Sequence, residues 1–383
     1  MGHKPLKNIV LTLITVIGPL SNIMGQVSTA EAFNLLIGTY TEPGKSDGIY
    51  VYKFDGKTGE FSYRAEATGV KNPSFLTASK DGKQVYSVSE VGEGKGSVSA
   101  FSFDPTSGKL DFLNSASSGG DGPCYVSVDD KNKLVFVGNY SGGSLSAVPV
   151  KADGSLGSDI QSIQHKGNSI LKNQTKPHVH STVLSPDNKY LYVPDLGTDK
   201  VNIYNVDLTK SSPLTTADPP FVSVEAGNGP RHFTFHPNGK FAYLIQEMTG
   251  NVTVFEYHDG KLRAKQSVTL APQGYNGPID AADIHISPDG KFLYGSLRGN
   301  IDEVVIYAIN KNGKLTYAGR QSTLGKNPRN FAIDPTGNFL LVANGGSDEI
   351  VVFKRNRETG LLMPAGKTIK VGAPVCLKFV PIK

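Results

Sequence analysis

A short phrase that recurs along the chain constrains its fold more than any other feature. Each copy joins a turn rich in Pro, Asp, Asn and Gly to an apolar strand, which is typical of a β-hairpin. The copies read SKDGKQVYSVSE, SPDNKYLYVPDL, HPNGKFAYLIQE, SPDGKFLYGSLR and DPTGNFLLVANG, with a divergent DDKNKLVFVGNY. A landmark, often proline, precedes each phrase by six residues and recurs near the C-terminus: Pro73, Pro123, Val179, Pro230, Ala281, Pro328 and Pro374. Subtraction gives spacings of 46 to 56 residues, close to the roughly 40 to 50 residues of a four-stranded propeller blade.

The two ends of the chain supply one blade between them. The segment NLLIGTY from Asn34 to Tyr40 matches the second strand of the repeat but has no turn phrase before it, and the missing first strand follows Pro374. Pairing of these strands would close the ring and remove exposed sheet edges. Neither a parallel β-helix nor a two-sheet sandwich would explain why the two ends of the chain share one blade. We therefore expect an all-β fold, a single seven-bladed β-propeller domain over residues 33–383, closed by N- and C-terminal strands in one blade.

Composition agrees with this architecture. The 43 Gly and 23 Pro imply many turns, and 18 Phe with 16 Tyr can fill a sizeable core. The net charge is +5, and the basic residues are scattered rather than gathered in one stripe. Nucleic acid is therefore not an expected partner, whereas a mild basic bias favours an anionic small molecule.

The first residues differ from the rest of the chain. Lys4 and Lys7 precede an apolar stretch from Ile9 to Leu20, and small residues follow. This pattern predicts a signal peptide over residues 1–32, cleaved somewhere in 25–32, and an exported protein, periplasmic or secreted. A buried strand or an uncleaved anchor is the alternative, but a membrane span needs roughly 20 apolar residues. We expect no stable membrane insertion after cleavage.

Polar residues recur at two registers of the repeat. Directly after the landmark stand Ser74, Cys124, His180, Arg231, Ala282, Arg329 and Val375, and the next strand ends at Tyr40, Glu90, Tyr140, Leu196, Glu247, Arg298 and Gly345. If both rings face one mouth of the central channel, His180, Arg231, Glu247 and Arg298 meet there. A base, an acid partner and two cations in one cleft suit an anionic acyl substrate.

Several segments resemble one known family. HVHSTVLSPDNKYLYVPDLGTDKV, GNGPRHFTFHPNGKFAYLIQE, AADIHISPDGKFLYGSLR and NPRNFAIDPTGNFLLVAN look like blades of bacterial propeller-type 6-phosphogluconolactonases. They are also similar to the related fungal carboxymuconate lactonizing enzyme. The similarity runs from about Phe33 to Val380. It implies an active site of one His, two Arg and one Glu, which match His180, Arg231, Glu247 and Arg298.

The expected reaction is hydrolysis of a sugar lactone to the open-chain acid. Arg231 and Arg298 would stabilise the carbonyl oxygen and hold a phosphate or carboxylate. Glu247 is expected to act as base for water and His180 as acid for the leaving oxygen, although the two roles could be exchanged. A lactone-forming cycloisomerase would use the same groups. A non-catalytic exported propeller that binds a carbohydrate or a protein is the third alternative.

Structural roles compete with these assignments. His180 could serve only to join blades, Arg231 and Glu247 could form a purely structural ion pair, and Arg298 could be a solvated turn residue. In a second rank, Asp283 and Arg329 are expected to bind substrate. The remaining histidines of these blades, His178, His232, His236 and His285, are expected to serve the scaffold more than the chemistry.

Other motifs give no further site. The sequence has no phosphate-binding P-loop and no nucleophile elbow, and its Gly92, Gly94 and Gly96 open no helix. We expect no cofactor and no metal. Cys124 and Cys376 stand in repeats separated by an intervening blade and at registers of opposite direction, so two free thiols are expected.

Overall fold

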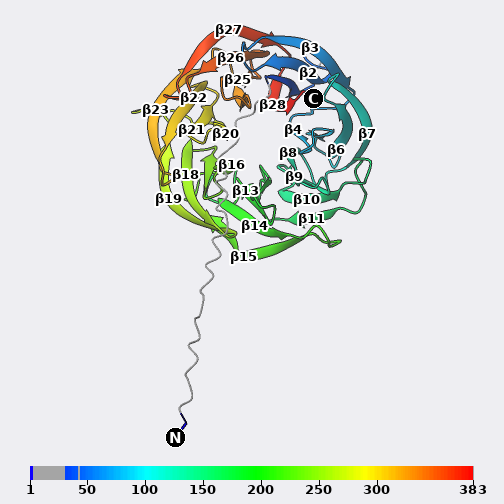
Figure 1. The fold of residues 1–383 in the computed structure, drawn as a ribbon, viewed down its shortest axis with the longest axis vertical. Coiled ribbons are helices and arrows are strands. Elements are labelled where there is room, and N and C mark those ends of the chain that lie inside the picture. The colour runs from blue at the N-terminus through cyan, green and yellow to red at the C-terminus, as the bar shows by residue number, and fades with distance from the viewer. Residues whose placement is uncertain (3–30, 42–43, 383) are drawn as a thin grey trace.

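The computed structural model describes residues 1–2, 31–41 and 44–382, and its strands form a ring (Figure 1). The described residues contain seven four-stranded antiparallel sheets and no helix. This part of the chain therefore has no helix that could cross a membrane. This confirms the expected all-β, seven-bladed propeller. The predicted signal peptide lies almost entirely in residues 3–30, outside the described part of the chain.

The first three blades hold the earliest strands of the chain together with the last one, β28. The blade that joins the termini contains β28 (Pro374–Pro381), β1 (Ala32–Thr39), β2 (Gly48–Asp55) and β3 (Phe61–Thr68). The second contains β4 (Leu76–Ala78), β5 (Gln84–Ser89), β6 (Ser97–Asp104) and β7 (Lys109–Ser117). The third contains β8 (Pro123–Val128), β9 (Leu134–Asn139), β10 (Ser144–Pro149) and β11 (Gln161–Gln164).

The other four blades repeat the plan. The fourth contains β12 (Val183–Leu184), β13 (Tyr190–Asp195), β14 (Lys200–Val206) and β15 (Leu214–Ser223). The fifth contains β16 (Pro230–Phe235), β17 (Phe241–Gln246), β18 (Asn251–His258) and β19 (Lys261–Thr269). The sixth contains β20 (Ala281–Ile286), β21 (Phe292–Leu297), β22 (Glu303–Ile309) and β23 (Leu315–Ser322). The seventh contains β24 (Pro328–Ile333), β25 (Phe339–Asn344), β26 (Glu349–Arg355) and β27 (Leu362–Lys370).

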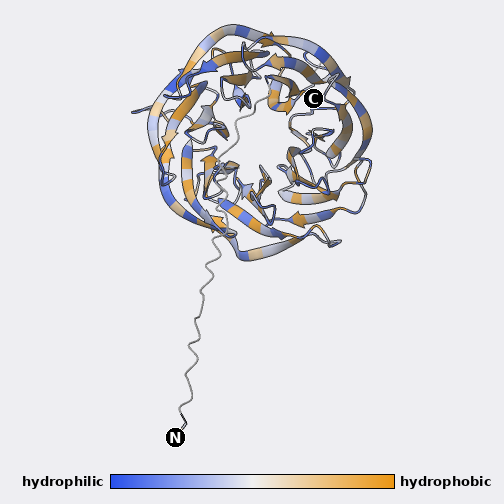
Figure 2. Cartoon of the chain, viewed as in Figure 1, coloured by the Kyte–Doolittle hydropathy of each residue, from blue (hydrophilic) through white to orange (hydrophobic). Residues whose placement is uncertain are grey.

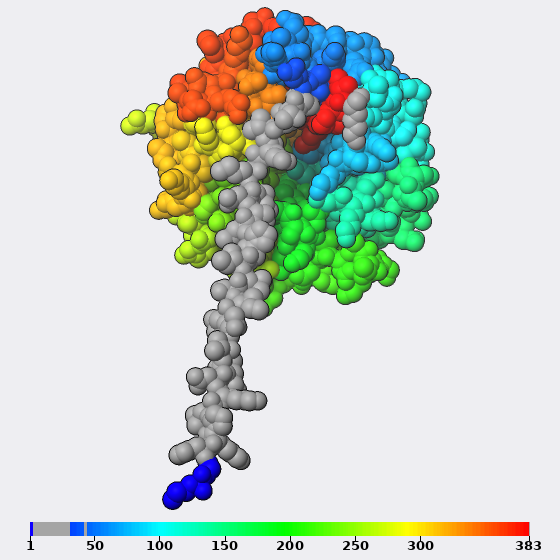
Figure 3. All heavy atoms as spheres, viewed as in Figure 1, coloured from blue at the N-terminus to red at the C-terminus, as the bar shows by residue number. Residues whose placement is uncertain are grey.

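The ring closes as the sequence predicts. Strand β28 pairs antiparallel with β1, from Phe33 opposite Pro381 to Thr39 opposite Pro374. In the space-filling view the red C-terminal strand lies beside the blue N-terminal blade (Figure 3). The first strand of each blade faces the central channel, and in most neighbouring blades the first strands contact one another there.

Apolar side chains between the blades form the core. Tyr243 and Ile245 of β17, for example, pack in one buried cluster with Leu293 of β21 and Val305 of β22. Along the strands at the rim, apolar and hydrophilic residues alternate (Figure 2), as expected where one face of a strand is buried. Each blade therefore buries its apolar residues against its neighbours, which explains why the fold needs the closed ring.

Buried tyrosines also tie successive blades together. In the second strand of four blades a tyrosine hydroxyl donates to a glycine carbonyl in the turn that leads to the outermost strand of the next blade. These bonds join Tyr86 to Gly154 at 3.2 Å, and Tyr192 to Gly260, Tyr243 to Gly313 and Tyr294 to Gly360 at 2.8 Å each. The hydroxyls thus satisfy carbonyls that are otherwise cut off from water.

Both cysteines are buried and free, as expected from their registers. Cys376 accepts a hydrogen bond from the backbone N–H of Leu76 at 3.3 Å, whereas Cys124 lies beside His180. Burial raises the pKa of the Cys376 thiol to about 11. The two thiols therefore lie in different parts of the channel wall.

A β-bulge directly after the landmark shapes the channel. Pairing of β16 with β17 shifts by one residue between Pro230 and His232, and pairing of β24 with β25 shifts between Pro328 and Asn330. The residues passed over are Arg231 and Arg329. A bulge leaves one residue outside the ladder and turns its side chain in a new direction. This local irregularity explains why long polar side chains occur at a position that would otherwise belong to the sheet.

Candidate active site

Glu247 is the centre of a charged cluster at one end of the channel, hereafter the Glu247 mouth. Its Oε2 accepts a hydrogen bond from Arg231 Nε at 2.8 Å and lies 3.2 Å from Arg298 Nη2. His180 Nε2 lies 3.7 Å from the same oxygen. The structure thus brings together all four residues that the sequence places in the catalytic set. Because all three contacts end on Oε2, Oε1 is left for a substrate or water.

The backbone fixes these residues through a ladder that recurs in every blade. The N–H of Glu247 donates to the carbonyl of Gly229 at 2.8 Å, and the N–H of Arg298 donates to Asp280 at 2.9 Å. Equivalent bonds position the other members of the second ring, Tyr40, Glu90, Tyr140, Leu196 and Gly345. Because the strands end in register, their last residues meet at one face of the ring.

Exposure distinguishes the members of the cluster. The side chain of Arg231 is 1% exposed and that of His180 4%, whereas Glu247 is 19% exposed. Of the two acid–base residues, His180 and Glu247, Glu247 is therefore the more accessible to solvent. The ion pair of Arg231 and Glu247 also spans the first two strands of one blade, so a structural contribution accompanies any chemical one.

Two of the arginines are held by further acceptors. Arg231 also donates to the carbonyl of Ala282, and burial, with Arg298 and Arg329 nearby, lowers its pKa to about 10. Arg298 donates from Nε to Asp280 Oδ1 at 2.8 Å. Sequence reasoning missed Asp280, although it directly precedes a landmark residue, and Arg298 is a buried, doubly paired residue rather than a solvated one.

His180 is neutral in this setting. Burial and the positive charge of Arg231 lower its pKa well below the ordinary value. The ring stands edge-on to Tyr140 with centroids 5.3 Å apart, and its Nδ1 lies 3.7 Å from Cys124 Sγ. A neutral imidazole cannot begin the reaction by donating a proton as an imidazolium cation does. It can accept a proton or transfer one.

Arg329 lies on another wall of the same mouth. Its guanidinium carbon is 5.9 Å from the ring centre of Tyr40, and Tyr40 donates a hydrogen bond to Glu90 Oε2 at 3.0 Å. Ser74 also bonds to Glu90. Burial alone would lower the pKa of Arg329, but Tyr40 and Glu90 raise it above its ordinary value. Arg329 nevertheless makes no ion pair or hydrogen bond through its side chain with any described residue, unlike Arg231 and Arg298.

Asp283 lies deeper in the channel, away from Glu247. It accepts hydrogen bonds from His232 Nδ1 at 2.7 Å and His285 Nε2 at 2.9 Å. Burial would raise the pKa of Asp283, but His285 and His232 hold it well below the ordinary value. The structure thus separates the two residues of the second rank, because Arg329 lies at the Glu247 mouth and Asp283 does not. His178 stacks on Tyr140, and His236 bonds to the Gly290 carbonyl of the next blade.

This geometry defines a class of protein. A closed seven-bladed propeller that presents a carboxylate, a neutral histidine and arginines at one channel mouth is suited to acid–base and electrostatic catalysis on an acyl group. The family described as "Lactonase, 7-bladed beta-propeller" matches residues 34–379. The chain belongs to this family of propeller lactonases, and it is a hydrolase that opens lactone rings.

Relatives cover almost the whole chain. The 6-phosphogluconolactonase of Formosa agariphila is 38% identical over 349 residues, which cover 90% of this chain and 99% of that protein. The 6-phosphogluconolactonase of Bacillus subtilis is 37% identical over 347 residues, 90% of this chain and 97% of that one. The solved structure of a periplasmic gluconolactonase from Pseudomonas aeruginosa superimposes with a TM-score of 0.88 at 39% identity, covering 92% of this chain and 100% of that chain.

Proposed function

We propose that this lactonase hydrolyses a sugar lactone at the Glu247 mouth. The observation that carries the proposal is the convergence of His180, Arg231 and Arg298 on one partly exposed carboxylate oxygen. Lactone hydrolysis needs a base for water, positive charge for the carbonyl oxygen and a proton for the leaving oxygen. These are the groups that the mouth offers.

Glu247 is the proposed general base. It is the more exposed acid–base residue, and the contacts of Oε2 with Arg231 and Arg298 hold the carboxylate while Oε1 is left for water. As water attacks the ring carbonyl, its proton moves to Glu247. The neutral state of His180 supports the same order of events, because His180 becomes an acid only after it accepts that proton.

Proton return then completes the reaction. Collapse of the tetrahedral intermediate breaks the ring C–O bond and leaves an alkoxide that takes up a proton. His180 Nε2, 3.7 Å from Glu247 Oε2, is the proposed carrier of the proton from Glu247 to this oxygen. The products are the open-chain hydroxyl and a carboxylic acid, which releases a proton to the solvent at neutral pH.

Arg329 is the proposed contact for the negative charge of the substrate or of its carbonyl oxygen. Arg231 and Arg298 already pair with carboxylates, so their main task in this proposal is to hold Glu247. Arg329 has donors to spare, and a guanidinium can form paired hydrogen bonds with phosphate, carboxylate or an oxyanion. From the sequence, Arg231 and Arg298 are expected to stabilise the charge on the carbonyl oxygen. Because both arginines are already paired with carboxylates, we assign this role to Arg329 instead.

We also propose that the protein is exported after cleavage between Gly25 and Ala32. The basic, apolar and small-residue pattern of the N-terminus supports this, as does the similarity to a periplasmic gluconolactonase. An exported enzyme would meet unphosphorylated sugar lactones. Mass spectrometry of the native protein should find a mature start between Gln26 and Phe33, and an intact Met1 in a cytoplasmic fraction would contradict export.

A panel of aldonolactones tests the activity. Purified mature protein is mixed with phosphorylated and unphosphorylated lactones in weak buffer, and proton release is followed against the spontaneous rate. We expect acceleration for at least one sugar lactone, with the unphosphorylated series favoured if the protein is exported. No acceleration across the panel would overturn the proposal and favour a binding role.

A further inference from the structure

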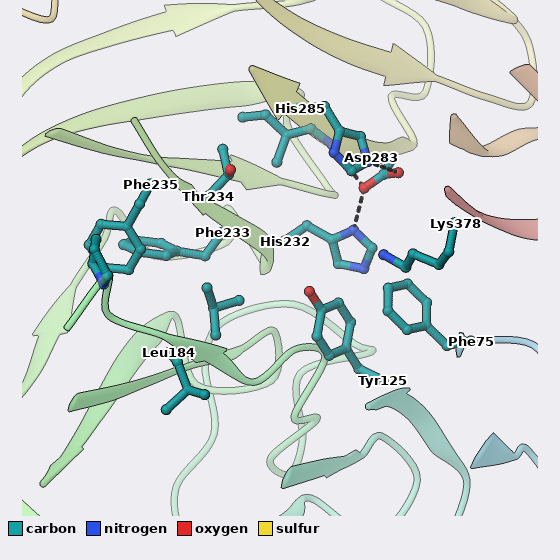
Figure 4. A pocket seen from close by; sticks show the side chains of 13 residues that line it. Phe75, Tyr125, Leu184, His232, Phe233, Thr234, Phe235, Asp283, His285 and Lys378 are labelled. Carbon is teal, nitrogen blue, oxygen red and sulfur yellow. Dashed lines mark hydrogen bonds and ion pairs between the residues drawn. The ribbon is translucent and has the colours of Figure 1, made fainter. Parts of the chain in front are cut away.

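A separate cavity of about 280 Å³ lies in the channel beyond His232 (Figure 4). The first strands of the blades run from the Glu247 mouth, where Arg231 lies, toward the opposite face, where β16 ends at Phe235. Residues of the middle and later parts of these strands line the cavity, among them Thr234, Phe235 and His285. The cavity thus opens toward the end of the channel away from Glu247. It is called the far cavity below.

Three polar side chains of the far cavity have unused hydrogen-bonding capacity. The Lys378 ammonium, the Tyr125 hydroxyl and the Thr234 hydroxyl make no hydrogen bond or ion pair with any described residue. Lys378 Nζ lies 4.7 Å from the ring centre of Phe75 and points toward His232 in Figure 4. All three side chains are partly exposed at the cavity. Their donors are therefore accessible to a ligand that supplies acceptors.

The Asp283 carboxylate lies at the same cavity but is already occupied. Its Oδ1 accepts from His232 and from the backbone N–H of Ile284, and its Oδ2 accepts from His285 and Asn330. Asp283 therefore acts on the cavity through its charge and by orienting His285. The His285 side chain is 33% exposed, and its Nδ1 remains for a ligand.

The remaining surface of the far cavity is apolar. Phe75 and Tyr125 stack with ring centres 4.1 Å apart, and the edge of His232 contacts both rings. Leu184 and Phe235 belong to the rest of the lining. Apolar walls beside a lysine suit a ligand that has a CH-rich face and one charged end.

We propose that the far cavity is a second binding site, which takes a small monocarboxylate with a CH-rich face, of the size of a sugar acid. The carboxylate would accept from Lys378 Nζ and the Tyr125 hydroxyl, and the carbon skeleton would lie along the apolar lining at Leu184 and Phe235. The nearby negative charge of Asp283 disfavours a dianion such as a phosphate monoester. This site stands on residues that the lactonase mechanism does not use, so it is independent of the proposed function.

Binding of gluconate to variants of the far cavity tests this inference. All titrations use the Arg329→Met background, which weakens the Glu247 mouth, and calorimetry gives the Kd. Loss of a charge-assisted hydrogen bond in Lys378→Met should raise the Kd by about ten- to a hundredfold. Lys378→Arg, the matched control, keeps the charge and should retain most of the affinity.

Two outcomes would overturn the proposal. The first is a Lys378→Met protein, folded with an unchanged Tm, that binds gluconate as tightly as its parent. The second is the absence of gluconate from the far cavity in crystals soaked with it, with ordered water alone beside Lys378. Thr234→Val provides a second variant at the same cavity and should weaken binding less, by about two- to tenfold.

Discussion

Replacing Glu247 by Gln separates chemistry from stability at the mouth, because the amide keeps the shape of the side chain and loses the basic carboxylate. A general base contributes typically about 10²- to 10⁴-fold to the rate. The kcat for lactone hydrolysis should therefore fall by about that factor, while KM changes less. Proton release from the best lactone of the panel measures both constants.

The same substitution should also lower stability, by an amount that the contacts set. Arg231 is almost fully buried but keeps the carbonyl of Ala282, and Arg298 keeps Asp280. The loss should therefore be smaller than the roughly 3 to 5 kcal/mol of breaking a fully buried pair, and we expect about 2 kcal/mol. For a chain of this size that corresponds to a Tm lower by about 3 °C.

Glu303→Gln is the matched control. Glu303 Oε2 pairs with Arg320 Nη1 at 2.8 Å, with side chains 24% and 25% exposed, on β22 and β23 away from the channel. Loss of this ion pair should lower Tm slightly and leave kcat unchanged. A wild-type kcat in Glu247→Gln would refute the role of Glu247 as base, whatever happened to Tm.

Three further results are expected. Arg329→Met should lower kcat/KM about ten- to a hundredfold, through loss of a charge-assisted hydrogen bond, and an unchanged kcat/KM would remove Arg329 from the mechanism. Burial beside Arg231 lowers the pKa of His232 to about 3, so the native ring stays neutral while the unfolded ring binds a proton below about pH 6.5. The free energy of unfolding should thus fall by roughly 1.4 kcal/mol per pH unit as pH decreases from there. In His232→Asn it should fall less steeply. Urea titrations at several pH values that give the same dependence on pH for both proteins would contradict this. Tyr243→Phe leaves the Gly313 carbonyl without its donor and should cost about 1 to 2 kcal/mol in urea unfolding with kcat unchanged, whereas an unaltered unfolding midpoint would show that the bond adds nothing.

The sequence predicts the ring because six of the seven blades carry their own turn and strand pattern. The spacing of Pro73 through Pro374 indicates seven blades, and the incomplete repeat before Tyr40 indicates closure by β28 and β1, which the structure confirms. Hairpin turns and apolar alternation are local features, so one sequence suffices to find them. The expectation of two free cysteines is also confirmed, since the intervening blade and the different registers separate Cys124 from Cys376.

The site is predictable only in part, because register tells where a strand ends but not which side chains meet across the ring. Register places Arg231 and Glu247 at one mouth, and they meet there. It does not reveal that Asp280 pairs with Arg298 from the preceding loop. Nor does it show that the bulged residue and its successor diverge, so that Arg231 turns to the mouth while His232 reaches Asp283 deeper in the channel. Contacts between blades depend on packing that no single repeat encodes.

A crystal structure with an aldonolactam tests the central claim most directly. The lactam keeps the ring and carbonyl of a sugar lactone but resists hydrolysis, and it carries no negative charge that would favour the far cavity. We expect its carbonyl oxygen within hydrogen-bonding distance of Arg329 and its carbonyl carbon beside Glu247 and His180. A lactam bound only elsewhere in the protein, with the Glu247 mouth filled by water, would contradict the account.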